Sequence, residues 1–182
     1  MASFAEFYKI LKASPPLRRI KLLLLVMVCL VASAALYFSG WEVYRMPDVS
    51  RQTVIEGRVS GYPSSWEHNR SIVRFAVAYK LDGVTEGKPI YLYQKLYEQS
   101  GLRINSKVLL NVERLEEGSM VRELATLDGR VLYNDRLHRQ VVAWNNKSIR
   151  AIVVMLGLVS ILIALAMLVI AVRHRRELFQ AG

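Results

Sequence analysis

The chain has 182 residues, of which 53% are hydrophobic, and a formal net charge of +10. Its single cysteine, Cys29, excludes a disulfide within the chain. The positive charge alone would suit a nucleic acid, but much of it lies beside two long apolar stretches, and the rest is mixed with acidic residues. We therefore expect a membrane protein whose partners include lipid and exclude nucleic acid.

The N-terminal segment, residues 1–21, carries apolar side chains at helical spacing ahead of a proline pair. The stripe consists of Phe4, Phe7, Tyr8 and Leu11, and Pro15-Pro16 follows it. This pattern predicts a short helix at the membrane interface. The alternative is that the stripe packs on the central domain or frays.

Two stretches, residues 22–41 and 151–172, contain no Asp, Glu, Lys, Arg or His. About 20 residues rising about 1.5 Å each match a hydrocarbon core of about 30 Å, so each stretch is predicted to be a transmembrane helix. The first also resembles a signal-peptide core followed by a cleavage site at Ala32-Ser33-Ala34. Its apolar run continues to Phe38, which is too long for an ordinary signal core.

Small side chains form one face of the first span. Ala32, Ala35 and Ser39 are expected to pack against the second span or a partner helix, because small residues let helix backbones approach closely. Cys29 in the same span is expected to be a small apolar filler rather than a redox or lipidated group.

Basic residues predict the orientation of the spans. Those before the first span are Lys9, Lys12, Arg18, Arg19 and Lys21, whereas only Arg45 and Arg51 follow it closely. The positive-inside rule therefore places the N-terminus in the cytoplasm. The second span gives a weaker signal, because basic residues flank both of its ends. Two spans put both termini on one side, so residues 173–182 are expected to be a cytoplasmic tail and the central domain to be extracytoplasmic.

Residues 42–133 show the alternating pattern of β-strands. The predicted strands cover residues 53–59, 71–81, 90–94, 107–113, 120–127 and 130–133, with a helical turn over residues 96–100. Asp82-Gly83 and Asp128-Gly129 predict tight hairpins, because glycine accepts a positive φ. Short strands with tight connections predict a small antiparallel β-barrel or sandwich.

After Tyr133 the pattern becomes helical. Leu137, Val141, Trp144 and Ser148 recur at helical spacing, and no proline interrupts residues 134–172. We expect a juxtamembrane helix over residues 134–150 that runs into the second span as one long helix. The predicted fold class is membrane α plus all-β, with two transmembrane helices flanking the β-domain.

Three motifs of the central region form a recognisable series. They are Gly57-Arg58-Val59, the Tyr79-Lys80-Leu81-Asp82-Gly83 hairpin, and Gly101 before the valine-rich strand at residues 108–112. This series resembles a bacterial family of two-span membrane proteins with a small extracytoplasmic β-domain of unknown function. Residues 111–114 depart from the family, which has a Tyr and a Pro-containing turn there. The resemblance implies the bacterial inner membrane and no particular chemistry.

Candidate partner-binding residues lie in one loop and one strand. Tyr62, Trp66 and Arg70 belong to an irregular polar loop over residues 61–70, and Tyr91 and Tyr93 belong to the predicted strand at residues 90–94. Aromatic groups flanked by polar ones are effective contact anchors. The alternatives are that Trp66 folds back onto the β-domain and that the tyrosines pack across their strand.

No residue pattern predicts catalysis, a cofactor or a metal site. His68 and His138 lack metal-ligand spacing, and Glu116-Glu117 precede Gly118 in an expected turn, where carboxylates are usually solvated. The spans carry no ionisable group, so an ion path through this chain alone is not expected.

Three functions are compatible with these observations. The first is a non-enzymatic, membrane-anchored accessory protein that presents its β-domain to a protein or envelope partner, or to a second copy of itself. The second is an immunity protein that neutralises a secreted toxin at the membrane. The third is an enzyme whose site the sequence does not reveal.

Overall fold

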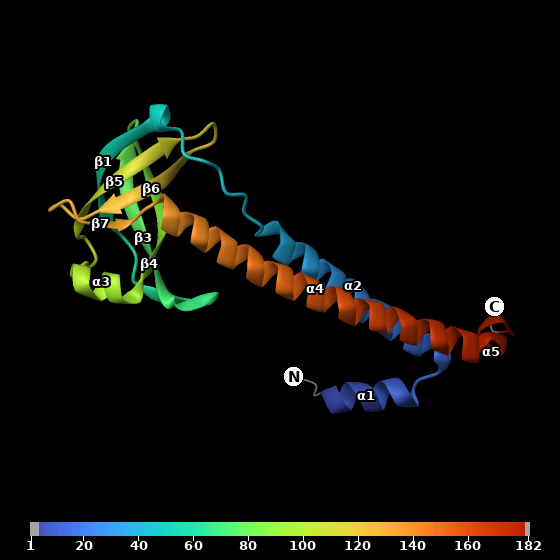
Figure 1. Ribbon diagram of the computed structural model, residues 1–182. Helices are drawn as coiled ribbons and strands as arrows, with labels where there is room; N and C mark the ends of the chain where they lie inside the picture. The colour runs from blue at the N-terminus through green and yellow to red at the C-terminus, as the bar shows by residue number, and fades with distance from the viewer. Residues whose placement is uncertain (1–3, 181–182) are drawn as a thin grey trace. The chain divides into compact units, whose positions relative to one another are not determined.

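The computed structural model describes residues 4–180, which form two compact units (Figure 1). One unit is the segment Glu42–Asn146, which contains the β-strands. The other consists of the described residues before Glu42 and after Asn146, which are helical.

The helical unit contains α1 (Phe4–Ala13), α2 (Pro16–Ser39), most of α4 (Asp135–Arg173) and α5 (Arg175–Gln180). Pro16 suits the first position of α2, where no backbone N–H is needed. Arg19 fixes the turn between α1 and α2, because its Nε and Nη2 donate to the carbonyls of Ser14 and Lys12, both at 2.6 Å. These bonds satisfy carbonyls that the end of α1 leaves unpaired.

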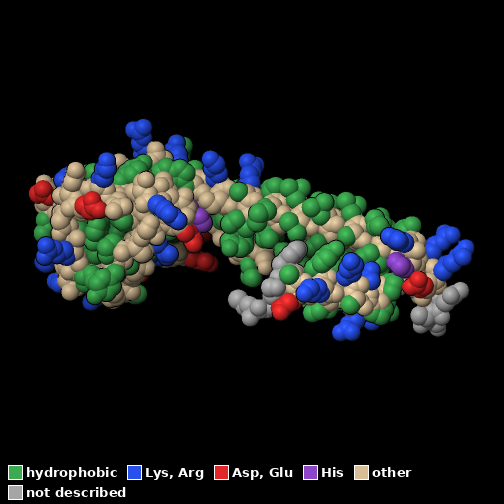
Figure 2. Space-filling view, turned by 90° about the horizontal axis from the view of Figure 1, so that it is seen from below, with side chains coloured by type: hydrophobic (Ala, Val, Ile, Leu, Met, Phe, Trp, Pro, Cys, Tyr) green, Lys and Arg blue, Asp and Glu red, His purple; other side chains and the backbone are tan. Residues whose placement is uncertain are grey.

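Both α2 and α4 are long and apolar enough to cross a membrane. Figure 2 shows hydrophobic side chains covering most of the visible helical surface and Lys and Arg gathering near the chain termini. The hydroxyls of Ser33 and Ser160 donate to the carbonyls of Cys29 and Leu156, one turn earlier. Each helix therefore satisfies these polar groups internally, as a hydrocarbon environment requires.

The predicted long helix after the β-domain is confirmed. The predictions for the first apolar helix and for the C-terminal tail were less complete. The juxtamembrane segment and the second apolar stretch form the single helix α4. However, α2 begins at Pro16, before the predicted span, and the predicted tail includes helix α5.

The β-unit is one seven-stranded antiparallel sheet. Its strands are β1 (Gln52–Val59), β2 (Ser64–Trp66), β3 (Asn69–Leu81), β4 (Val84–Tyr93), β5 (Lys107–Arg114), β6 (Ser119–Ala125) and β7 (Val131–Tyr133). A short 3₁₀ turn, Val49–Arg51, precedes β1, and helix α3 (Gln94–Ser100) follows β4. β3 pairs with β1, β2 and β4, and the order continues from β1 through β5 and β6 to β7.

This sheet is curled into a half-barrel (Figure 1). The predicted antiparallel β-domain is confirmed, but a closed barrel and a two-sheet sandwich are both wrong. β4 pairs only with β3, so it does not close onto β6 or β7 by a strand ladder. Pro89 lies in β4, and an edge strand tolerates a residue that cannot donate to a ladder.

The Asp82-Gly83 hairpin has the predicted geometry. Asp82 has a φ of 50° and Gly83 a φ of 84°, as a two-residue turn with both central residues left-handed requires. This turn fixes the β3–β4 register, in which Leu81 lies opposite Val84 and Ile72 opposite Tyr93.

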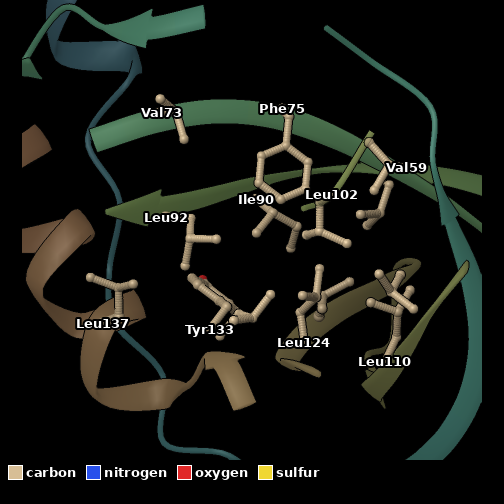
Figure 3. Close-up of a cluster of buried hydrophobic side chains, with 14 of the residues drawn as sticks. Val59, Val73, Phe75, Ile90, Leu92, Leu102, Leu110, Leu124, Tyr133 and Leu137 are labelled. Carbon is tan, nitrogen blue, oxygen red and sulfur yellow. The ribbon is translucent and has the colours of Figure 1, made fainter. Parts of the chain in front are cut away.

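The core fills the concave side of the sheet. Figure 3 shows side chains from several strands, from the loop between α3 and β5 and from α4 meeting there: Val59, Val73, Phe75, Ile90, Leu92, Leu102, Leu110, Leu124, Tyr133 and Leu137. Leu137 and Val141 come from the first turns of α4, so this helix covers part of the core that the open half-barrel leaves. Burial of these apolar groups is the main stabilising contribution to the unit.

Candidate functional site

The structure divides the five predicted partner-binding residues among three places. Trp66 is only 6% exposed, and its ring centroid lies 4.9 Å from that of Tyr91 and 5.1 Å from that of His68. A register shift between Ser65 and Trp66 accompanies this inward turn. Trp66 thus belongs to the core, which agrees with the alternative that it folds back onto the β-domain. Tyr91 is half-buried beside it.

Tyr62, by contrast, is 84% exposed. It lines a shallow hollow of about 390 Å³ together with Ser64, Arg74 and Lys88. The backbone at Gly61 approaches β3 closely, because a Cβ there would lie 3.1 Å from Ala76. The loop therefore lies against the sheet and leaves the Tyr62 ring in solvent.

Arg70 and Tyr93 are brought together in a larger hollow beside α3. Its volume is about 620 Å³, and Leu96, Lys95 and Glu98 of α3 also line it. α3 is held against the sheet by Tyr97, whose ring centroid lies 5.2 Å from that of Phe75. The hollow is thus built on a packed element, which favours a preformed shape.

A second hollow of about 360 Å³ adjoins the first, because Tyr93 and Leu96 line both. β7 and the start of α4 supply the remaining wall, including Val131, Arg136 and Gln140. The Tyr93 hydroxyl donates to Gln140 Oε1 at 3.1 Å, which ties β4 to α4 across the floor. We call the two hollows together the α3 groove.

The half-barrel is open between β4 and β6, which are not paired, and we call this gap the open seam. A smaller cavity of about 160 Å³ lies there. Lys88 and Tyr91 of β4 line one side, and Ser119 of β6 lines the other, with His138 of α4. Ser119 bridges the seam, since its hydroxyl lies 2.7 Å from the Tyr79 hydroxyl and donates to Glu86 Oε2 at 2.7 Å. This bond and the one from Lys88 lower the pKa of Glu86, whereas burial raises the pKa of Tyr79.

Tyr133 and His138 both line this cavity and form a hydrogen-bonded pair, with 2.9 Å between the hydroxyl and Nδ1. Burial raises the pKa of the Tyr133 phenol. Burial, and then the positive charge of Arg122, lower the pKa of His138. Both groups are therefore neutral at pH 7, which suits a structural contact between β7 and α4.

A buried ion pair lies where the chain enters and leaves the β-unit. Arg122 is 3% exposed, and its Nε donates to Glu113 Oε2. Glu113 Oε1 accepts from the backbone N–H of Asp48 at 2.9 Å, and Arg122 Nη1 lies 3.5 Å from Asp135 Oδ1. Asp135 in turn accepts from the Tyr44 hydroxyl. The pair therefore holds both the segment before β1 and the start of α4 on the sheet.

The burial of Arg122 was not predicted from the sequence, because a β-bulge in β6 turns its side chain inward. Asn111 lies opposite Glu123 and Val112 opposite Val121, so Arg122 is the extra residue of β6. Val121 and Arg122 are both buried although they are neighbours in a strand. Strict alternation would put one of them in solvent, and no local sequence signal marks the shift.

The predicted helix-packing residues, Ala32, Ala35 and Ser39, are exposed within the helical unit. The Ser39 hydroxyl donates to the Leu36 carbonyl at 2.7 Å. Their role as a packing face therefore stays a prediction that concerns a partner helix.

Among residues 4–180, no three His, Cys, Asp or Glu side chains converge closely enough to hold a metal ion. The chain matches no protein-family model, no curated protein and no solved structure at a significant level. The resemblance to the bacterial two-span family thus remains an expectation from the sequence motifs.

Proposed function

We propose that this protein is a non-enzymatic, membrane-anchored interaction protein of the bacterial inner membrane. In this proposal α2 and the apolar part of α4 span the bilayer, both termini are cytoplasmic, and the β-unit lies outside the cytoplasm. The basic residues before α2 support this orientation, and the length and apolar character of the two helices support the anchoring.

The α3 groove is the observation that carries the binding role. It is a large recess, and an aromatic ring that is 37% exposed, Tyr93, stands at the junction of its two parts. Tyrosine in a recess, surrounded by polar groups, is a typical anchor of protein interfaces. A protein partner is therefore the occupant that best matches this surface.

Site-specific photo-cross-linking in the full-length protein tests this proposal. A photo-reactive amino acid is placed at Tyr93 and, as a matched control, at Val84, which is 63% exposed. These residues lie at opposite ends of β4, about 30 Å apart along the strand. After irradiation of cells, the adducts are purified and identified by mass spectrometry.

We expect one protein to be cross-linked at Tyr93 in near-stoichiometric yield and not at Val84. Recovery of this chain alone would point to a homo-oligomer. The absence of any Tyr93-specific protein adduct would contradict the proposal.

A further inference from the structure

Three cations border the α3 groove without a counter-charge. Arg70 is the second residue of β3, Lys95 is on α3, and Arg136 is on the first turn of α4. All three are exposed, and none forms an ion pair with any carboxylate among residues 4–180. Glu98 is the acidic residue that lines the groove, and its carboxylate accepts from Gln94 at 2.9 Å.

Some other basic residues of the β-unit, by contrast, have carboxylate partners. Lys88 lies 3.0 Å from Glu86, Lys107 2.8 Å from Glu56, and Arg114 2.7 Å from Asp82. The groove therefore combines recessed shape with uncompensated positive charge, which attracts a negatively charged segment and orients it.

We propose that the α3 groove binds an acidic peptide segment of the partner protein, with an apolar side chain seated on Tyr93 and Leu96. This inference rests on the proposed function and specifies the chemistry of its partner. Apolar groups form the floor, where Leu96 packs against the core and Leu132 and Leu137 are buried below. The cations stand around this floor, so an acidic segment with one apolar anchor matches both features.

A peptide matches the groove better than an anionic membrane surface does. The groove is recessed, and the amides of Gln94, Asn134 and Gln140 are among the groups that line it. A protruding side chain of a peptide can reach these amides, whereas a flat layer of lipid headgroups would contact only the rim of the groove. A second copy of this chain is a poorer occupant, because its net charge of +10 repels it.

The inference is tested with full-length protein in phosphatidylcholine nanodiscs and a random dodecapeptide display library. Two charge-matched triple variants are compared with the wild type. The groove variant is Arg70→Gln, Lys95→Gln, Arg136→Gln. The control variant is Arg58→Gln, Lys80→Gln, Arg103→Gln, at exposed basic residues that do not line the groove.

The wild type is expected to enrich Asp- and Glu-rich peptides that contain a Leu or an aromatic residue. For synthetic copies of these peptides, affinity falls about tenfold in the groove variant and less than about twofold in the control variant. Raising the salt concentration weakens binding to the wild type and control more than to the groove variant.

Three outcomes would overturn the inference: no enrichment, enrichment without acidic bias, or equal affinity of the groove variant and the wild type. Binding to phosphatidylglycerol vesicles that the groove variant alone loses, without peptide binding, would assign the groove to lipid. If Tyr93 still cross-links a protein in the groove variant, the proposed function stands and the acidic-segment inference fails. If Tyr93 cross-links nothing in the wild type, the proposed function itself fails.

Discussion

Gly57 has no room for a side chain. A Cβ at this position would lie 2.4 Å from Leu110 Cδ1 and 3.1 Å from the Ala78 carbonyl oxygen. Leu110 is fully buried, and the Ala78 carbonyl belongs to the β1–β3 ladder, so neither can move freely. We therefore expect Gly57→Ala to lower the free energy of unfolding of the β-unit by about 1–3 kcal/mol.

Gly87→Ala is the matched control, because a Cβ at Gly87 meets nothing within 4 Å. Urea unfolding of the full-length protein, followed by tryptophan fluorescence, measures both variants. Equal midpoints for the two variants would show that β1 is not held as closely to β5 as described.

Arg122 is a second residue whose replacement should lower the free energy of unfolding by a measurable amount. Replacing it with Met leaves Glu113 buried without its cation, so the free energy of unfolding should fall by about 3–5 kcal/mol. Lys107→Met removes the same charge from the exposed pair with Glu56 and should cost at most about 1 kcal/mol. Similar losses in both variants, by urea unfolding, would contradict the buried position of Arg122.

At the scale of elements, we expect the contact between α4 and the sheet to be sensitive to pH, because His138 of α4 bonds to Tyr133 of β7. The folded state holds His138 neutral, because burial lowers its pKa. The unfolded chain binds a proton near the ordinary pKa of about 6.5, so the stability from this group is present above that pH and is lost as the pH falls below it. We expect the melting temperature of the full-length protein to decrease on acidification through this range.

The variant His138→Gln should show a weaker decrease, because it has no group to protonate there. Tyr133→Phe is the control: it removes the hydrogen bond but leaves His138 buried, so the pH dependence should persist. Parallel melting curves for wild type and His138→Gln between pH 7 and pH 5 would refute this account.

Elements with a long regular pattern were predictable. β3 alternates over most of its length, and α4 keeps its helical spacing without a proline, so both were expected at nearly their observed bounds. β2 has only three residues, which is too short for a pattern to be visible. The part of β4 before Ile90 contains Gly87 and Pro89, which argue locally against a strand; pairing with β3 overrides them.

The candidate site was predictable only in part. Arg70 and Tyr93 were chosen for their side-chain chemistry, and the structure places both in the α3 groove. Arg136 was not among the predicted site residues, because its approach to Tyr93 depends on long-range packing. Likewise, the curl that leaves the sheet open is a property of all strands together and has no local signature.

For the whole molecule, the proposed orientation makes a labelling prediction. In a Cys29→Ala background, Glu117→Cys places a thiol in the exposed β5–β6 turn, and Arg175→Cys places one on α5. A membrane-impermeant maleimide added to spheroplasts should label the first site, because the β-unit is proposed to be extracytoplasmic. The second site should react only after permeabilisation.

Each variant is the control for the other, since both thiols should react fully in detergent. The reverse pattern would invert the orientation, and labelling of both sites in intact spheroplasts would show that the termini and the β-unit share one side. The charge bias before α2 is the physical reason for the expected result.

The Glu113–Arg122 pair also has a consequence for the order of folding. Its two residues are nine apart in the chain, whereas Tyr44 and Asp135, which bond beside it, are 91 apart. Short loops close at a smaller entropic cost, so the β5–β6 hairpin can assemble before the ends of the β-unit meet. During synthesis this hairpin is complete before α4 emerges, so we expect the segment around Tyr44 to be fixed only after Asp135 is in place.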